Sequence, residues 1–227
     1  MREATAGAIV RTGGSGPPWI VVDHAVESVV AAHWPGRLWQ VEILKAGRER
    51  PRAEASYTRA LSVRVIGEAP VSLLFGPHGD LVCRVIEKAS VVTLEEVSRL
   101  PAARHPLARR AYSCAWSRWL GRGDAESGEE HADTLAAPSD GTNSRSPIGS
   151  GFTVLYAVLT NRARELAGDA AFVLDDEGDP VFAPDWQAAA DAFLHAAMAF
   201  GAPDLASSDA HVLIAAWETL NRHTPEA

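Results

Sequence analysis

One stretch, residues 56–87, constrains the fold of this chain most strongly, because it holds two separate β-strand patterns. Between Leu61 and Val65, apolar and polar side chains alternate, which is typical of a strand that buries one face. Further on, the apolar runs 72–75 and 81–86 flank a short segment, 76–80, that contains glycine, proline and aspartate. Two apolar runs around such a segment predict a β-hairpin. We therefore expect an N-terminal sheet built around this stretch.

More strands are predicted before this stretch. Residues 6–11 are a short apolar run typical of an edge strand, and residues 19–22 form a second β-rich run. Residues 25–33 have helical spacing, and the preceding Asp23 is a suitable N-cap residue. The segment 37–44 alternates again and predicts another half-buried strand.

Two helices are predicted after the hairpin. Thr93 and Glu96 have the spacing of a capping box at the start of a helix that Pro101 ends. Residues 106–119 have the spacing of a basic amphipathic helix, which we expect to pack its apolar face on the sheet. Anion or membrane binding is the alternative reading of its arginines.

A compositional break at residues 121–151 divides the chain. The segment is rich in Gly, Ser, Asp and Glu and has very few large apolar residues, so we expect a flexible linker. The predicted organisation is a β-rich α+β domain over 1–120, this linker, and a mainly helical part over 152–227 with one hairpin. The elements of that last part are expected at 152–166, 171–174, 180–182, 186–200 and 208–221. The predicted fold class is α+β, with a mixed or antiparallel N-terminal sheet and short helices.

Composition narrows the classes of function. The net charge of −8 argues against a general binder of nucleic acid or anionic membranes, which needs a basic face. No run approaches the roughly 20 apolar residues of a membrane span, and no signal peptide stands out. Cys83 and Cys114 lie outside any CxxC motif, and two free thiols fit a reducing compartment, with a disulfide between them as the alternative. We expect a cytoplasmic protein.

Candidate chemical sites are few. The eight histidines form no HExxH motif, and we predict no metal site. The acidic turn 175–179 lacks the spacing of a calcium loop and predicts a solvated hairpin tip. His78 and Asp80 lie close together in the predicted first hairpin loop, and an enzyme built on them is the lowest-ranked hypothesis.

A longer pattern covers Trp19 to Glu68. A strand at 19–21, a helix from His24, a strand reading LWQVE at 38–42, and then SYTR and VIGE at 56–59 and 65–68 follow one another. This order resembles the rifampicin ADP-ribosyltransferases, which belong to the ADP-ribosyltransferase-like fold. That family grips NAD in a cleft of a split sheet.

The resemblance implies roles for particular residues. Trp19 stands where the family has a tyrosine that stacks on nicotinamide, and Val21 where it has a threonine. Arg11, Trp19 and Tyr57 are the expected NAD-binding side chains. Glu68 is the expected carboxylate, with Arg11, in cleavage of the nicotinamide–ribose bond through an oxocarbenium-like transition state. Each has a structural alternative, in a strand end, the core or a turn.

The competing hypothesis is a non-catalytic protein–protein interaction module of similar fold, of an immunity or regulator type. It is favoured by the acidic charge, by the departures from the family motifs and by the seven tryptophans. Its partner would be a protein in place of NAD.

Overall fold

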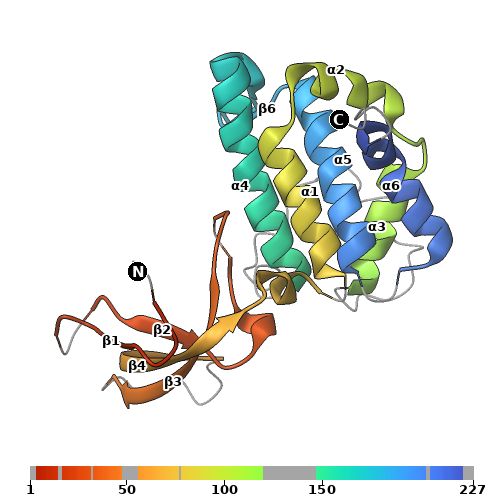
Figure 1. Ribbon diagram of the computed structural model, residues 1–227. Coiled ribbons are helices and arrows are strands. Elements are labelled where there is room, and N and C mark those ends of the chain that lie inside the picture. The colour runs from red at the N-terminus through yellow and green to blue at the C-terminus, as the bar shows by residue number, and fades with distance from the viewer. Residues whose placement is uncertain are drawn as a thin grey trace, which may run out of the picture.

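A computed structural model describes residues 4–14, 17–31, 33–47, 56–76, 78–119, 147–202 and 205–221. These residues form the predicted α+β fold, with an antiparallel sheet near the N-terminus followed by six α-helices. Figure 1 shows the sheet at one end of the helix bundle, with the segment after β4 leading from one to the other.

The N-terminal sheet is built around one long strand. Its four strands are β1 (Ile9–Arg11), β2 (Ile20–Asp23), β3 (Leu38–Ala46) and β4 (Tyr57–Ala69). All of the other strands pair antiparallel to β4. The positions of Val63 and Arg64 pair with both β1 and β3, so β3 lies along one edge of β4, and β1 and β2 lie end to end along the other. The four predicted strands at these positions are confirmed.

An apolar row crosses the sheet at its centre. Val63 on β4 is paired with Val10 on one side and with Ile43 on the other, and Val65 is paired with Val41. Val63 and Val65 are almost fully buried. Because side chains alternate between the two faces of a strand, the residues on either side of this row point to the opposite face.

The predicted first hairpin is wrong. Residues 72–75 belong to a 3-10 helix, η2 (Val71–Phe75), and residues 81–86 belong to helix α1 (Gly79–Val91). The buried residues of α1 have helical spacing, namely Val82, Val85, Ile86 and Ala89. The short apolar run fits a strand equally well by itself, but its pattern continues to Ala89, beyond the usual length of a strand.

The predicted helix over 25–33 is also wrong. The chain there makes a single 3-10 turn, η1 (Val26–Ser28), and no side chain caps its start. Asp23, the expected cap, is instead the last residue of β2 and is paired with Tyr57. The valines of this segment are β-branched and favour extended structure, which explains why the turn does not propagate.

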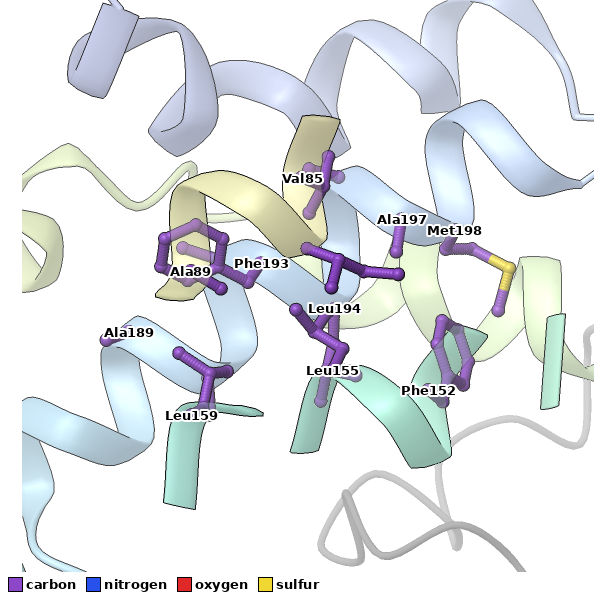
Figure 2. Packing of buried hydrophobic residues seen from close by; sticks show 14 of the residues in the cluster. Val85, Ala89, Phe152, Leu155, Leu159, Ala189, Phe193, Leu194, Ala197 and Met198 are labelled. Atoms are coloured by element: carbon purple, nitrogen blue, oxygen red, sulfur yellow. The ribbon is translucent and has the colours of Figure 1, made fainter. Parts of the chain in front are cut away.

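Helix α5 is the centre of the bundle. The six helices are α1, α2 (Leu94–Ala103), α3 (Ala108–Trp119), α4 (Pro147–Ala167), α5 (Pro184–Gly201) and α6 (Ser207–Asn221). Almost every residue from Ala189 to Met198 is buried, as expected for a helix that is apolar on all sides. Figure 2 shows Phe193 and Leu194 of α5 meeting Val85 of α1 and Leu155 of α4.

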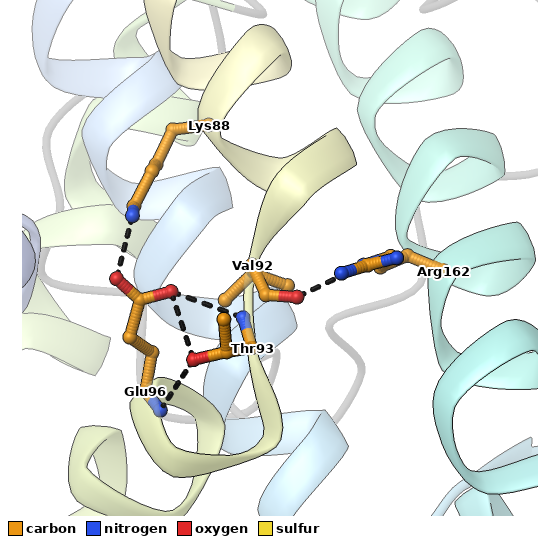
Figure 3. A network of polar contacts seen from close by, with 5 residues as sticks. All are labelled: Lys88, Val92, Thr93, Glu96 and Arg162. Carbon is orange, nitrogen blue, oxygen red and sulfur yellow. Dashed lines mark hydrogen bonds and ion pairs between the residues drawn. The ribbon is translucent and has the colours of Figure 1, made fainter.

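The predicted capping box at the start of α2 is confirmed. The Thr93 hydroxyl accepts a hydrogen bond from the Glu96 backbone N–H at 3.2 Å, and the Glu96 carboxylate accepts one from the Thr93 N–H at 3.0 Å. Lys88 of α1 bonds the same carboxylate at 2.5 Å, and Arg162 of α4 donates to the Val92 carbonyl at 2.9 Å (Figure 3). These bonds tie the ends of α1 and α2 to α4.

Two details of the helix predictions are wrong. Pro101 does not end α2, which continues to Ala103, because a proline in the last turn removes few backbone hydrogen bonds. Helix α3 packs against α5 and α6 and not against the sheet. The bundle has its own extensive core, and the apolar face of α3 completes it.

The C-terminal hairpin is confirmed as β5 (Phe172–Leu174) and β6 (Pro180–Phe182), and the helices around it are found where expected. Residues 121–146 of the predicted linker lie outside the described residues, while 147–151 belong to α4. The division into 1–120, 121–151 and 152–227 stays a prediction. Helices from both sides of the break contribute to one hydrophobic cluster.

Candidate functional site

The residues that the resemblance implies lie at different positions along β4. Tyr57 is the first residue of this strand and Glu68 the last but one. At about 3.3 Å per residue, their separation along the strand is roughly 36 Å. Both residues belong to one continuous strand, and its length keeps them apart.

Arg11 and Trp19 lie nearer to Tyr57 than to Glu68. Arg11 is paired with Ser62, in the middle of β4. The ring of Trp19 packs over Gly47, where a ring carbon is 3.3 Å from the position that a Cβ would take. Gly47 follows β3 and donates a backbone hydrogen bond to the carbonyl of Arg59 at 2.7 Å. Trp19 is therefore a packing residue over Gly47, directly before Ile20, which is paired with Ala60 of β4.

Glu68 forms an ion pair with Arg37. The Arg37 guanidinium donates two hydrogen bonds to the Glu68 carboxylate, at 2.9 and 2.6 Å, and lies 4.4 Å from the centre of the Trp39 ring. The hydrogen bonds from Arg37 lower the pKa of Glu68 despite some loss of hydration. The carboxylate is thus exposed, ionised and bound to a neighbouring side chain.

These positions do not converge on one pocket. Tyr57 lies at one end of β4 and Glu68 at the other, whereas Arg11, paired with Ser62, and Trp19, next to the partner of Ala60, lie between them. A nicotinamide–ribose unit is much shorter than β4 and needs its aromatic clamp and carboxylate together. NAD binding by this chain stays a prediction, and this arrangement gives it no geometric support.

The sheet presents an exposed face with two polar rows. In the first row, Arg64 is paired with Ile9 on β1 and with Glu42 on β3. Arg64 and Glu42 form an ion pair at 2.6 Å. Ile9 is 45% exposed, and Ile66, two residues beyond Arg64 on the same strand, is 48% exposed. This row is therefore part charged and part apolar.

The second row carries two cations. Ser62 is paired with Arg11 on β1 and with Lys45 on β3. With strands about 4.8 Å apart, Arg11 and Lys45 are roughly 10 Å from each other. Both are exposed, and neither forms an ion pair with another residue of the described ranges. We call Ile9, Arg11, Lys45, Ser62, Arg64 and Ile66, with Glu42, the open sheet face, in which Ser62 itself is buried between the two cations.

Charge is distributed unevenly along the chain. Residues 1–69 contain nine Lys or Arg and seven Asp or Glu, whereas residues 70–227 contain 12 and 22. The part of the chain that forms the sheet is thus slightly basic, and the remainder strongly acidic. Most of that acidic excess lies outside the six helices, in the segment 120–146 and in the hairpin turn 175–179.

A second polar cluster lies inside the helix bundle. Asp191 on α5 is almost fully buried, accepts a hydrogen bond from Gln187 at 2.9 Å and lies 3.3 Å from the guanidinium of Arg104. Burial raises the pKa of Asp191, although Gln187 and Arg104 act in the opposite direction. Burial has the larger effect on the pKa of Asp191, because Arg104 is itself partly solvated and its charge is therefore partly screened.

His195 lies one turn further along α5 and is 2% exposed. Its ring centre is 4.9 Å from that of Tyr112. Burial, with the nearby charges of Arg104 and Arg109, lowers the pKa of His195 to about 3. The imidazole is therefore neutral in the folded protein. The sequence analysis missed this cluster, although an acid and a histidine four residues apart in an apolar run were a usable signal.

The remaining titratable candidates have structural roles. His78 directly precedes α1, and Asp80 lies in its first turn, where a negative charge stabilises the helix N-terminus. Both are exposed and flank no cavity described here. Burial raises the pKa of the Cys83 thiol to about 11, which disfavours the reactive thiolate. Cys83 and Cys114 are both free, as expected.

The class that fold and surface define is an α+β protein with a small antiparallel sheet beside a helix bundle. The chain matches no family model, no curated protein and no solved structure. Among the described helices, none combines the length and apolar character needed to cross a membrane.

Proposed function

We propose that this protein is a non-catalytic interaction module that binds an acidic segment of a partner protein on its open sheet face. The observation that carries this proposal is the pair of exposed cations, Arg11 and Lys45, on either side of Ser62. Two neighbouring cations without a carboxylate partner in the described ranges repel each other weakly. An acidic ligand removes that repulsion and gains two charge-assisted hydrogen bonds.

Apolar side chains beside the cations add to the proposed surface. Ile9 and Ile66 are about half exposed and lie on the same side of the sheet as Arg64. A partner segment that mixes carboxylates with aliphatic side chains would bury these isoleucines while pairing with the cations. Such a mixture gives affinity through apolar burial and orientation through charge.

The extent of the open sheet face suits a macromolecular partner, while a separate cavity of about 350 Å³ beside Thr93 and Thr219 has the volume of a small-molecule site. The open sheet face extends over three adjacent strands. The buried cluster around His195 and Asp191 adjoins a cavity of only about 10 Å³. Small-molecule sites usually enclose about 300–1,000 Å³, so that cavity cannot hold a substrate.

A binding titration tests the proposal. The probe is a fluorescent peptide rich in glutamate with two leucines, and its control is the same peptide with glutamine in place of glutamate. We expect Arg11→Glu with Lys45→Glu to weaken binding of the acidic peptide by about tenfold or more. Arg110→Glu, which reverses an exposed charge on α3, is the matched control and should change it little. Equal binding of both peptides, or an unchanged affinity of the double variant, would contradict the proposal.

A further inference from the structure

The strongest unexplained feature is a small, partly open cavity between α2, α3, α5 and α6. It measures about 10 Å³ and is lined by apolar side chains, including Leu100 and Leu213, and by the polar groups of Arg104, Asp191 and His195. A volume of this size is close to the smallest that accommodates one water molecule. No larger ligand fits without a change in the helix packing.

His195 supplies the main reason to look for an occupant. Its Nε2 atom is fully buried and has no hydrogen-bond partner among the residues that the structure describes. Buried imidazole nitrogens are normally paired with a protein group or with an ordered water, because an unpaired one loses its hydration without compensation. Since His195 lines the cavity, an occupant there is within reach of the side chain.

The other polar groups of the cavity have bonding capacity left. The Asp191 carboxylate receives one hydrogen bond from Gln187 and an ion pair from Arg104, and a carboxylate accepts up to about four hydrogen bonds. Arg104 has several N–H donors, and its side chain is about one-third exposed. A buried water needs two to four polar partners, and these three residues supply them.

We infer that this cavity is a specific hydration site, in which one water molecule joins His195 Nε2 to the Asp191–Arg104 pair. The water links α5 to the end of α2, and Arg104 closes the site toward solvent. A metal ion is a poorer fit, because the described residues contain no group of three His, Cys, Asp or Glu side chains placed to bind one. The neutral imidazole serves either as acceptor or as donor toward the water, according to its tautomer.

A crystal structure of the full chain that resolves ordered water tests this inference. We expect a single peak about 2.7–3.2 Å from Nε2 of His195 and within the same range of Asp191 or Arg104. In solution, the His195 ring proton should show a cross-relaxation signal to a long-lived water. Arg104→Ala should shorten the residence time of that water. His195→Leu should abolish the site.

An empty cavity, or a direct bond from Nε2 to a protein group, would overturn the inference. So would the absence of the water signal at His195 under conditions where other buried waters are detected. If the His195→Leu protein does not fold, the measurements on the wild-type protein still decide the question. This inference is independent of the proposed function, since the cavity and the open sheet face share no residues.

Discussion

Arg37 donates two hydrogen bonds to Glu68 at the end of β4 that lies farthest from Tyr57. The ion pair gives the Glu68 carboxylate a structural partner at the protein surface. A catalytic carboxylate would instead have to face a bound substrate. Exposed ion pairs contribute little to stability, because solvent screens them. We therefore expect Glu68→Gln and Arg37→Gln to cause small, similar and non-additive losses of stability in a urea-unfolding cycle. A large loss in either variant would contradict this view of the pair.

Gly79 allows η2 and α1 to approach closely. A Cβ atom at this position would lie 1.9 Å from the backbone oxygen of Ser72. Gly79→Ala should therefore lower the free energy of unfolding by at least about 1–3 kcal/mol, the usual cost of overpacking. Gly67→Ala is the matched control, because nothing lies within 4 Å of its Cβ position. Equal stability of the two variants in urea unfolding would show that Gly79 does not lie so close to the backbone oxygen of Ser72.

The Thr93 hydroxyl caps α2 through the backbone N–H of Glu96. Thr93→Ala should destabilise the protein by about 1 kcal/mol, the usual value for a lost N-cap. Thr93→Ser retains the hydroxyl and should retain most of the stability. The measurement is the shift in the urea midpoint. A serine variant as unstable as the alanine variant would assign the loss to the methyl group of Thr93 instead of the cap.

His195 should make the bundle sensitive to acid. Its pKa in the folded protein is about 3, against an ordinary value of 6.5, so below pH 6.5 the unfolded chain binds a proton that the folded protein does not. The free energy of unfolding should therefore decrease as the pH is lowered from roughly 6 to roughly 4, by up to about 1.4 kcal/mol per pH unit. Asp191 acts in the opposite direction, because its raised pKa favours proton uptake by the folded protein in acid.

Urea unfolding at about pH 7 and pH 5 measures this dependence. His195→Leu should reduce the loss between the two pH values, whereas His211→Leu, at an exposed position of α6, should retain it. An unchanged pH dependence in His195→Leu would assign the acid sensitivity to other groups.

The sequence predicted elements well where one periodic pattern ran for most of their length. The alternation across β3 and β4 is an example. The cap of α2 was also predicted, because the spacing of two nearby residues decides it. The run 81–86 was misassigned because a short apolar segment satisfies both periods, and the helical period is distinguished only when the pattern is followed on to Ala89.

The two polar sites were harder to predict, for a different reason. Arg11 and Lys45 become neighbours of Ser62 only through the register of three strands. Asp191 meets Arg104 only when α5 packs beside the end of α2. Such contacts join residues that are distant in the sequence, and apart from the spacing of Asp191 and His195 a single sequence has no local signal for them.

Mapping the binding surface by NMR tests the central claim most directly. The acidic peptide is titrated into isotopically labelled protein, and the amide shifts are followed residue by residue. The account predicts that the largest changes lie at Ile9, Arg11, Lys45, Ser62 and Arg64, on the open sheet face, and that Arg11→Glu with Lys45→Glu removes them. Changes confined to the helix bundle, or no changes at saturating peptide, would contradict it.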